Sequence, residues 1–200
     1  MFIVQFLILI YSVILHEISH GFVADRLGDP TARLAKRLTL DPRPHIDLWM
    51  TILLPLLLFL SHAGIIFGAA KPVPIDPFNF RDPKKDTALV ALAGPLTNFL
   101  IAILLSILLR LLPYQSVYNV LSTAIVWNVG LALFNLFPLP PLDGFKVLTG
   151  LVSDDIARDL IRLERFGFTI IFIVLIFFPG FIFGVISPIM RTITSLLLPY

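Results

Sequence analysis

The chain has 200 residues, of which 58% are hydrophobic and only 14% are charged, and its mean hydropathy is +0.94. This composition excludes a water-soluble domain and is typical of a polytopic α-helical membrane protein. The net charge of +2 does not indicate nucleic-acid binding, and the absence of cysteine excludes disulfides and thiolate metal ligands.

The first apolar stretch, residues 2–24, contains the sequence HEISH at residues 16–20. No basic residue precedes the stretch and it has no small-residue cleavage site, so it is interpreted as a membrane span and not as a secretion signal. On a helix, the H-E-x-x-H spacing places two imidazoles one turn apart and about 40° apart around the axis, where both can bind one zinc ion. Glu17 then lies beside the metal and can accept a proton from a bound water.

Three ionisable side chains inside one span need a compensating interaction, because each costs on the order of a few kcal/mol at mid-bilayer. A metal ion bound by His16 and His20 would provide it. The alternative is a polar cluster that holds helices together without a metal.

The second apolar stretch, residues 46–68, contains Pro55 and is either kinked or only partly inserted. Residues 71–77 follow, and their closely spaced prolines predict an extended segment. The third span, residues 87–112, contains the sequence GPLTN at residues 94–98. The fourth, residues 117–137, ends at a proline break, residues 138–141.

Residues 142–165 are predicted to form an amphipathic surface helix, with acidic residues early and basic residues late. Residues 166–186 are predicted to be a fifth span. The expected fold is therefore all-α and polytopic, with about five apolar spans and one membrane domain over residues 1–200. With five full crossings the 15 Lys and Arg residues divide almost evenly between the two sides, so charge does not decide the orientation. Either the polar motifs meet near the midplane, or residues 46–68 are re-entrant.

A third metal ligand is expected, because a hydrolytic zinc usually takes three protein ligands and one water. Asp143 is the only acidic residue after the first span that adjoins the apolar stretch of another span. Gly144 allows the backbone to approach closely behind this ligand. The alternative for Asp143 is a helix cap after the proline turn.

Three motifs together, HEISH at 16–20, GPLTN at 94–98 and NLFPLPPLDG at 135–144, resemble the site-2 protease family of intramembrane zinc metalloproteases, in its compact form without a PDZ or CBS domain. The resemblance implies one Zn²⁺ held by His16, His20 and Asp143, with Glu17 as the catalytic residue that activates water. It also implies that Asn135 and Asn98 are substrate-binding residues. Interhelical hydrogen bonding is the alternative for both.

The predicted function is zinc-dependent intramembrane hydrolysis of peptide bonds in membrane-spanning substrates, by a multi-pass protein of the cell membrane. Its expected partners are a membrane protein or peptide and the lipid bilayer, and no nucleic acid. An unwound substrate is expected to add as a strand to residues 71–77. The alternatives are a metal transporter or channel and an inactive relative that binds membrane helices.

Overall fold

A computed structural model describes residues 2–62, 68–112 and 115–199. Within these ranges the chain forms helices joined by turns and extended segments, with no β-strand, which confirms the all-α prediction. The helices are α1 (Phe2–Leu27), α2 (Thr31–Leu34), η1 (Arg43–His45), η2 (Leu48–Leu53), α3 (Leu54–Leu60), η3 (Pro77–Asn79), α4 (Pro83–Leu111), α5 (Gln115–Asn135), α6 (Asp143–Leu151), α7 (Asp154–Glu164), α8 (Gly167–Phe177) and α9 (Pro179–Leu197).

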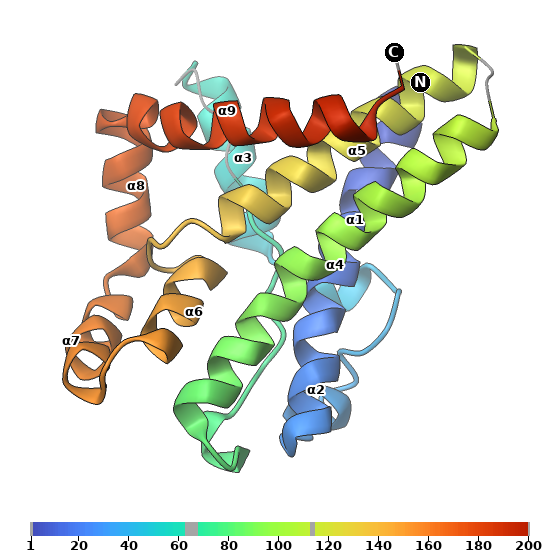
Figure 1. The fold of residues 1–200 in the computed structure, drawn as a ribbon. Coiled ribbons are helices and arrows are strands. Elements are labelled where there is room, and N and C mark those ends of the chain that lie inside the picture. Colours follow the sequence, from blue (N-terminus) through green and yellow to red (C-terminus); the bar gives the residue numbers. More distant parts are fainter. Residues whose placement is uncertain (1, 63–67, 113–114, 200) are drawn as a thin grey trace.

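Helices α1, α4 and α5 form the bundle on which the rest of the chain packs (Figure 1). Helix α4 lies against both α1 and α5, and it runs in the opposite direction to them (Figure 1). A core of apolar side chains fills the contact between α4 and α5, namely Ala102, Leu109, Leu121, Ile125 and Val129. Because α1 and α5 run in the same direction, the HEISH motif late in α1 and the segment that follows α5 come to the same end of the bundle.

The described part of the stretch at residues 46–68 contains no helix long enough to cross a membrane. Its helices, η2 and α3, together form one apolar helical stretch of 13 residues, or roughly 20 Å, which is shorter than the hydrocarbon thickness of about 30 Å. The chain then returns beside its starting point, because the Ala69 N–H donates to the Met50 carbonyl at 3.0 Å and the Thr51 hydroxyl donates to the Ala69 carbonyl at 2.7 Å. Residues 63–67 lie outside the described residues. The short helices and the return of the chain to its starting point fit the re-entrant alternative left by the sequence.

Residues 68–76 are extended, as the prolines predict, and run along α1 (Figure 1). Lys71 is held on both sides, since its N–H donates to the His45 carbonyl at 2.9 Å and its carbonyl accepts from Arg37 Nη2 at 2.7 Å. Further along, the Asp76 N–H donates to Asp29 Oδ2 at 2.8 Å. The hydrogen bonds that a neighbouring strand would make to this segment are therefore made by side chains and by loop backbone.

Asp29 is the anchor where the extended segment passes the end of α1. Burial alone would raise the pKa of Asp29, but hydrogen bonds from Thr31, Asp76 and Asn79 lower it below its ordinary value. The carboxylate therefore remains ionised and binds the segment through charge-assisted hydrogen bonds.

Two predicted helices are each divided in the structure. The surface helix expected at residues 142–165 is α6 and α7, separated at residues 152–153. The span expected at residues 166–186 is also wrong, because α8 ends at Phe177 and α9 begins at Pro179. Helix α9 then continues to Leu197 and lies across α5, at a large angle to α8 (Figure 1). By length and composition, the helices able to cross a membrane are α1, α4, α5 and α9.

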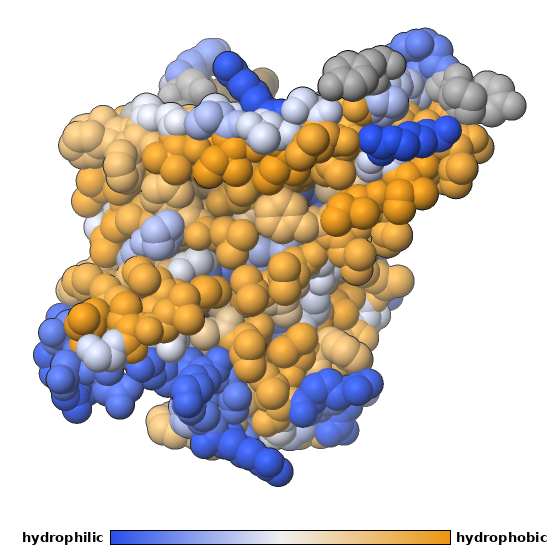
Figure 2. All heavy atoms as spheres, viewed as in Figure 1, coloured by the Kyte–Doolittle hydropathy of each residue, from blue (hydrophilic) through white to orange (hydrophobic). Residues whose placement is uncertain are grey.

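The face of the molecule seen in Figure 2 has a wide apolar band, with polar side chains gathered mainly at one end. Large apolar side chains on α4 point away from the protein, including Leu100, Leu104 and Ile107, each about half exposed. Such a surface is stable against lipid and not against water, so the chain is a membrane protein.

Candidate metal centre

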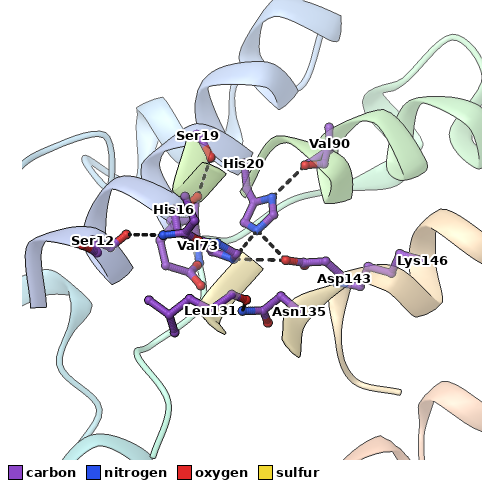
Figure 3. A network of polar contacts seen from close by, with 12 residues as sticks. Ser12, His16, Ser19, His20, Val73, Val90, Leu131, Asn135, Asp143 and Lys146 are labelled. Atoms are coloured by element: carbon purple, nitrogen blue, oxygen red, sulfur yellow. Dashed lines mark hydrogen bonds and ion pairs between the residues drawn. The ribbon is translucent and has the colours of Figure 1, made fainter. Parts of the chain in front are cut away.

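His16, His20 and Asp143 converge on one point inside the bundle (Figure 3). The two Nε2 atoms are 3.1 Å apart, and Asp143 Oδ2 lies 3.1 Å from the Nε2 of His16 and 3.3 Å from that of His20. Both histidines are buried, with exposed fractions of 6% and 7%. The H-E-x-x-H spacing of α1 therefore brings the imidazoles together, and α6 supplies the carboxylate as its first residue.

The Nε2 atoms of both histidines have free lone pairs in this arrangement. His16 Nδ1 donates to Asn98 Oδ1 at 2.6 Å, and His20 Nδ1 donates to the Val90 carbonyl at 2.7 Å. A neutral imidazole protonated at Nδ1 has a lone pair at Nε2. Asp143 Oδ2 is likewise buried without a hydrogen-bond donor among the described residues. Three electron-pair donors thus face one another, which is favourable only around a cation.

The distances between these three atoms fit zinc. Zn–N and Zn–O bonds of about 2.0–2.1 Å at tetrahedral angles place neighbouring ligand atoms roughly 3.3 Å apart. The observed separations of 3.1, 3.1 and 3.3 Å are close to that value. The set of two imidazoles and one carboxylate is also one that hydrolytic zinc sites use, with the fourth position left for water.

Gly94 of α4 forms the floor of the centre. A Cβ atom at this position would lie 2.5 Å from both His16 Cε1 and His20 Nε2. Any side chain here would therefore occupy the space beside the two ligand nitrogens, and glycine keeps it open.

Asp143 reaches the histidines because the loop after α5 folds tightly against the start of α6. A Cβ on Gly144 would lie 2.0 Å from the Leu136 carbonyl oxygen, so the close backbone approach predicted for this glycine is confirmed. The Asp143 side chain makes no capping hydrogen bond to α6 and turns instead to the two histidines (Figure 3). These contacts are those of a ligand and not of a helix cap.

Glu17 is held by the extended segment. Its Oε2 accepts a hydrogen bond from the Val73 N–H at 2.9 Å. Gly21, one turn further along α1, allows this approach, because a Cβ there would lie 2.9 Å from Val73 Cγ1. The segment at residues 68–76 therefore passes directly over the face of α1 that carries Glu17.

The two asparagines predicted to bind substrate have different surroundings. Asn135 is partly buried and donates to the Leu131 carbonyl at 2.9 Å (Figure 3). Asn98 is completely buried behind His16. Its contacts are therefore those of a residue that orients a ligand, which the sequence did not indicate. Substrate binding by either asparagine stays a prediction.

Val90 was missed by the sequence analysis, because it acts through its backbone carbonyl, for which an apolar side chain gives no signal. Asn128, a polar residue within a span, is expected from the sequence to hold helices together, and in the structure it joins Asn98 to α1.

A buried His–His–Asp cluster in a bundle of membrane-length helices is the arrangement of a membrane-embedded zinc metalloprotease. The model of Peptidase family M50, the site-2 protease family, matches residues 4–118. YwhC of Bacillus subtilis (strain 168), named as a zinc metalloprotease, is 37% identical over 181 residues, covering 86% of this chain and 78% of YwhC. Rip2 of Mycobacterium tuberculosis (strain H37Rv) is also named as a zinc metalloprotease. It is 33% identical over 184 residues, covering 88% of this chain and 68% of Rip2. No solved structure matches the chain.

The chain therefore belongs to Peptidase family M50, which confirms the resemblance drawn from the three motifs. It is a zinc metalloendopeptidase, and its metal is Zn²⁺.

Proposed function

We propose that this protein hydrolyses peptide bonds of membrane-spanning substrates inside the cell membrane, with zinc held by His16, His20 and Asp143. The observation that carries the proposal is the position of the cluster. The two histidines lie in the second half of α1, one of the membrane-length helices, and are buried within the bundle. A substrate that reaches them comes from the membrane or from a cavity within it.

Glu17 is the general base in this proposal. Bound zinc supplies a Lewis acid that polarises the scissile carbonyl and makes water more acidic. Glu17 accepts one proton as the water oxygen bonds to the carbonyl carbon, and it then passes this proton to the leaving amide nitrogen. The products are a carboxylic acid, which keeps the second proton of the water, and an amine, and at neutral pH they ionise to a carboxylate and an ammonium group. The Val73 N–H donates to Oε2 of Glu17, and in this proposal the other carboxylate oxygen accepts the proton.

The substrate must be extended at the cut site, because a helix engages its own carbonyl groups in hydrogen bonds. Residues 70–75 offer an edge for such a strand. Backbone groups of Ala69, Lys71 and Val73 form hydrogen bonds with other parts of the protein. The carbonyls of Pro72 and Pro74, at the alternate positions, accept no hydrogen bond from another described residue. Substrate N–H groups can donate to these two carbonyls, and in this proposal Asn135 holds the peptide or its oxyanion.

The test is cleavage of a transmembrane peptide by the purified protein in liposomes, comparing the wild type with Glu17→Gln. The variant should retain its zinc and lose about 10²–10⁴-fold in kcat, because it cannot accept the proton. Mass spectrometry of the products locates the cut. Cleavage by Glu17→Gln at the wild-type rate, or cuts only in the water-exposed ends of the peptide, would overturn the proposal.

A further inference from the structure

A line of buried hydrogen bonds leads from His16 to α5, a helix outside the His16–His20–Asp143 cluster. Asn98 on α4 accepts from His16 through Oδ1 and donates through Nδ2 to Asn128 Oδ1 at 3.0 Å. Asn128 on α5 in turn donates to the Ser12 hydroxyl at 2.9 Å. Asn98 and Asn128 have exposed fractions of 0% and Ser12 of 2%. We name Asn98, Asn128 and Ser12 the amide relay.

Two backbone carbonyls fix the direction of every bond in the amide relay. Asn128 Nδ2 also donates to the Ala124 carbonyl at 2.9 Å, and the Ser12 hydroxyl donates to the Ile8 carbonyl at 2.8 Å. A backbone carbonyl only accepts hydrogen bonds. Asn128 must therefore turn its nitrogen toward Ala124 and Ser12, which leaves its oxygen facing Asn98.

The orientation of Asn98 follows from that of Asn128. An oxygen on Asn128 requires the nitrogen of Asn98, whose second donor points to the Ser12 carbonyl at 3.4 Å. The oxygen of Asn98 then faces His16 and can only accept, so the proton of His16 must be on Nδ1. Reversing either amide would place two donors or two acceptors against each other in a site closed to bulk solvent.

We propose that Asn128, acting through Asn98, sets the tautomer and orientation of His16 and thereby the zinc affinity of the centre. This rests on the zinc site of the proposed function. Asn128 is a positioning residue, because it contacts neither the metal site nor the substrate edge. His20 needs no such arrangement, since the Val90 carbonyl alone fixes its tautomer. The packing of α5 against α1 is in this way coupled to the chemistry of α1.

The first experiment measures the zinc dissociation constant of Asn128→Leu by chelator competition, together with the absorption spectrum of the Co²⁺-substituted protein. We expect about tenfold weaker zinc binding, as for other partners behind a histidine ligand, and an altered Co²⁺ spectrum. Thr123→Val is the matched control. Thr123 lies on the same helix and accepts from Gln5 on α1 at 3.0 Å, so this variant loses an α1–α5 hydrogen bond outside the amide relay. Its zinc affinity should equal that of the wild type.

The second experiment separates a relay from general loosening of the bundle. In an Asn98→Leu background, Asn128→Leu should cause no further loss of zinc affinity, because its path to His16 is already interrupted. Fully additive losses, equal losses in Thr123→Val, or wild-type affinity in Asn128→Leu would each overturn the proposal. Thermal unfolding of the metal-free proteins identifies variants that do not fold, and Asn128→Ala then replaces the leucine variant.

Failure of the relay can be told apart from failure of the zinc site. If His16→Ala or Asp143→Ala binds zinc as tightly as the wild type, the ligand assignment itself is wrong. If these two variants lose zinc while Asn128→Leu retains wild-type affinity, only the relay is wrong.

Discussion

Gly94 has no side chain at the point where the imidazoles of His16 and His20 need room, and Gly94→Ala tests this directly. The new Cβ would lie 2.5 Å from His16 Cε1 and His20 Nε2, and real Cβ atoms do not approach that closely. The imidazoles would have to separate, so we expect zinc affinity to fall by about 100-fold or more. Zinc per chain and the zinc dissociation constant measure the effect.

Gly130→Ala is the control for this substitution. It adds the same methyl group to α5, where the nearest atom would be Met190 Cε at 3.8 Å, an ordinary contact. This variant should bind zinc normally. Equal zinc binding by Gly94→Ala and Gly130→Ala would show that the metal does not lie between the two histidines.

At the residue scale, local spacing predicts which side chains lie together on one helix but not which side chains of different helices contact each other. The separation of His16 and His20 by four residues is enough to place them side by side on any helix. Asn98 could not be assigned in this way, because its partner on α1 depends on how far α4 is rotated about its axis. Asp143 was found because it is an isolated acid beside a proline break, which is a signal of composition and not of geometry.

At the element scale, composition predicted apolar stretches but not where each helix stops. Residues 166–186 are continuously apolar, yet Phe178 has φ −133° and ψ 45° and separates α8 from α9. Pro179 explains the break, because proline disfavours a helical conformation in the residue before it and is well tolerated in the first turn of a new helix. A re-entrant segment is equally hard to recognise, since η2 and α3 are as apolar as a span.

Strand addition to the extended segment predicts which N–H groups of the substrate are needed for cleavage. If the peptide adds as a strand, its N–H groups at every second residue donate to the carbonyls of Pro72 and Pro74, and the intervening N–H groups point away. We compare two substrate peptides that each carry two N-methyl groups at alternate positions away from the scissile bond. In the second peptide both methyl groups are shifted by one residue, so the two peptides should be cleaved at different rates. One should be cleaved about tenfold more slowly than the other, because it loses two hydrogen bonds. Equal cleavage rates would contradict strand addition.

At the scale of the whole molecule, the re-entrant segment changes how the charges are distributed across the membrane. The end of α1, helix α2 and the start of α4 lie at one end of the bundle (Figure 1), and Lys84 of α4 forms an ion pair with Asp154 of α7 at 2.7 Å. The basic residues of these elements are Arg26, Arg33, Lys84, Lys85, Arg158 and Arg162. At the opposite end, the helices carry Arg110 in the last turn of α4 and Arg191 on α9. The even division applies to five full crossings, whereas the described helices able to cross a membrane by length and composition are α1, α4, α5 and α9.

This asymmetry predicts that the start of α4 faces the cytoplasm, because cytoplasmic loops carry the excess of Lys and Arg. The chain contains no cysteine, so single cysteines report its orientation without a background. Lys85→Cys and Gln115→Cys place a thiol at exposed positions near the start of α4 and the start of α5, at opposite ends of the bundle. In intact cells, a membrane-impermeant maleimide should label Gln115→Cys and reach Lys85→Cys only after permeabilisation. The reverse pattern would place the start of α4 outside the cell. It would mean that the basic residues at this end of the bundle serve packing between α4 and α7 and not membrane orientation.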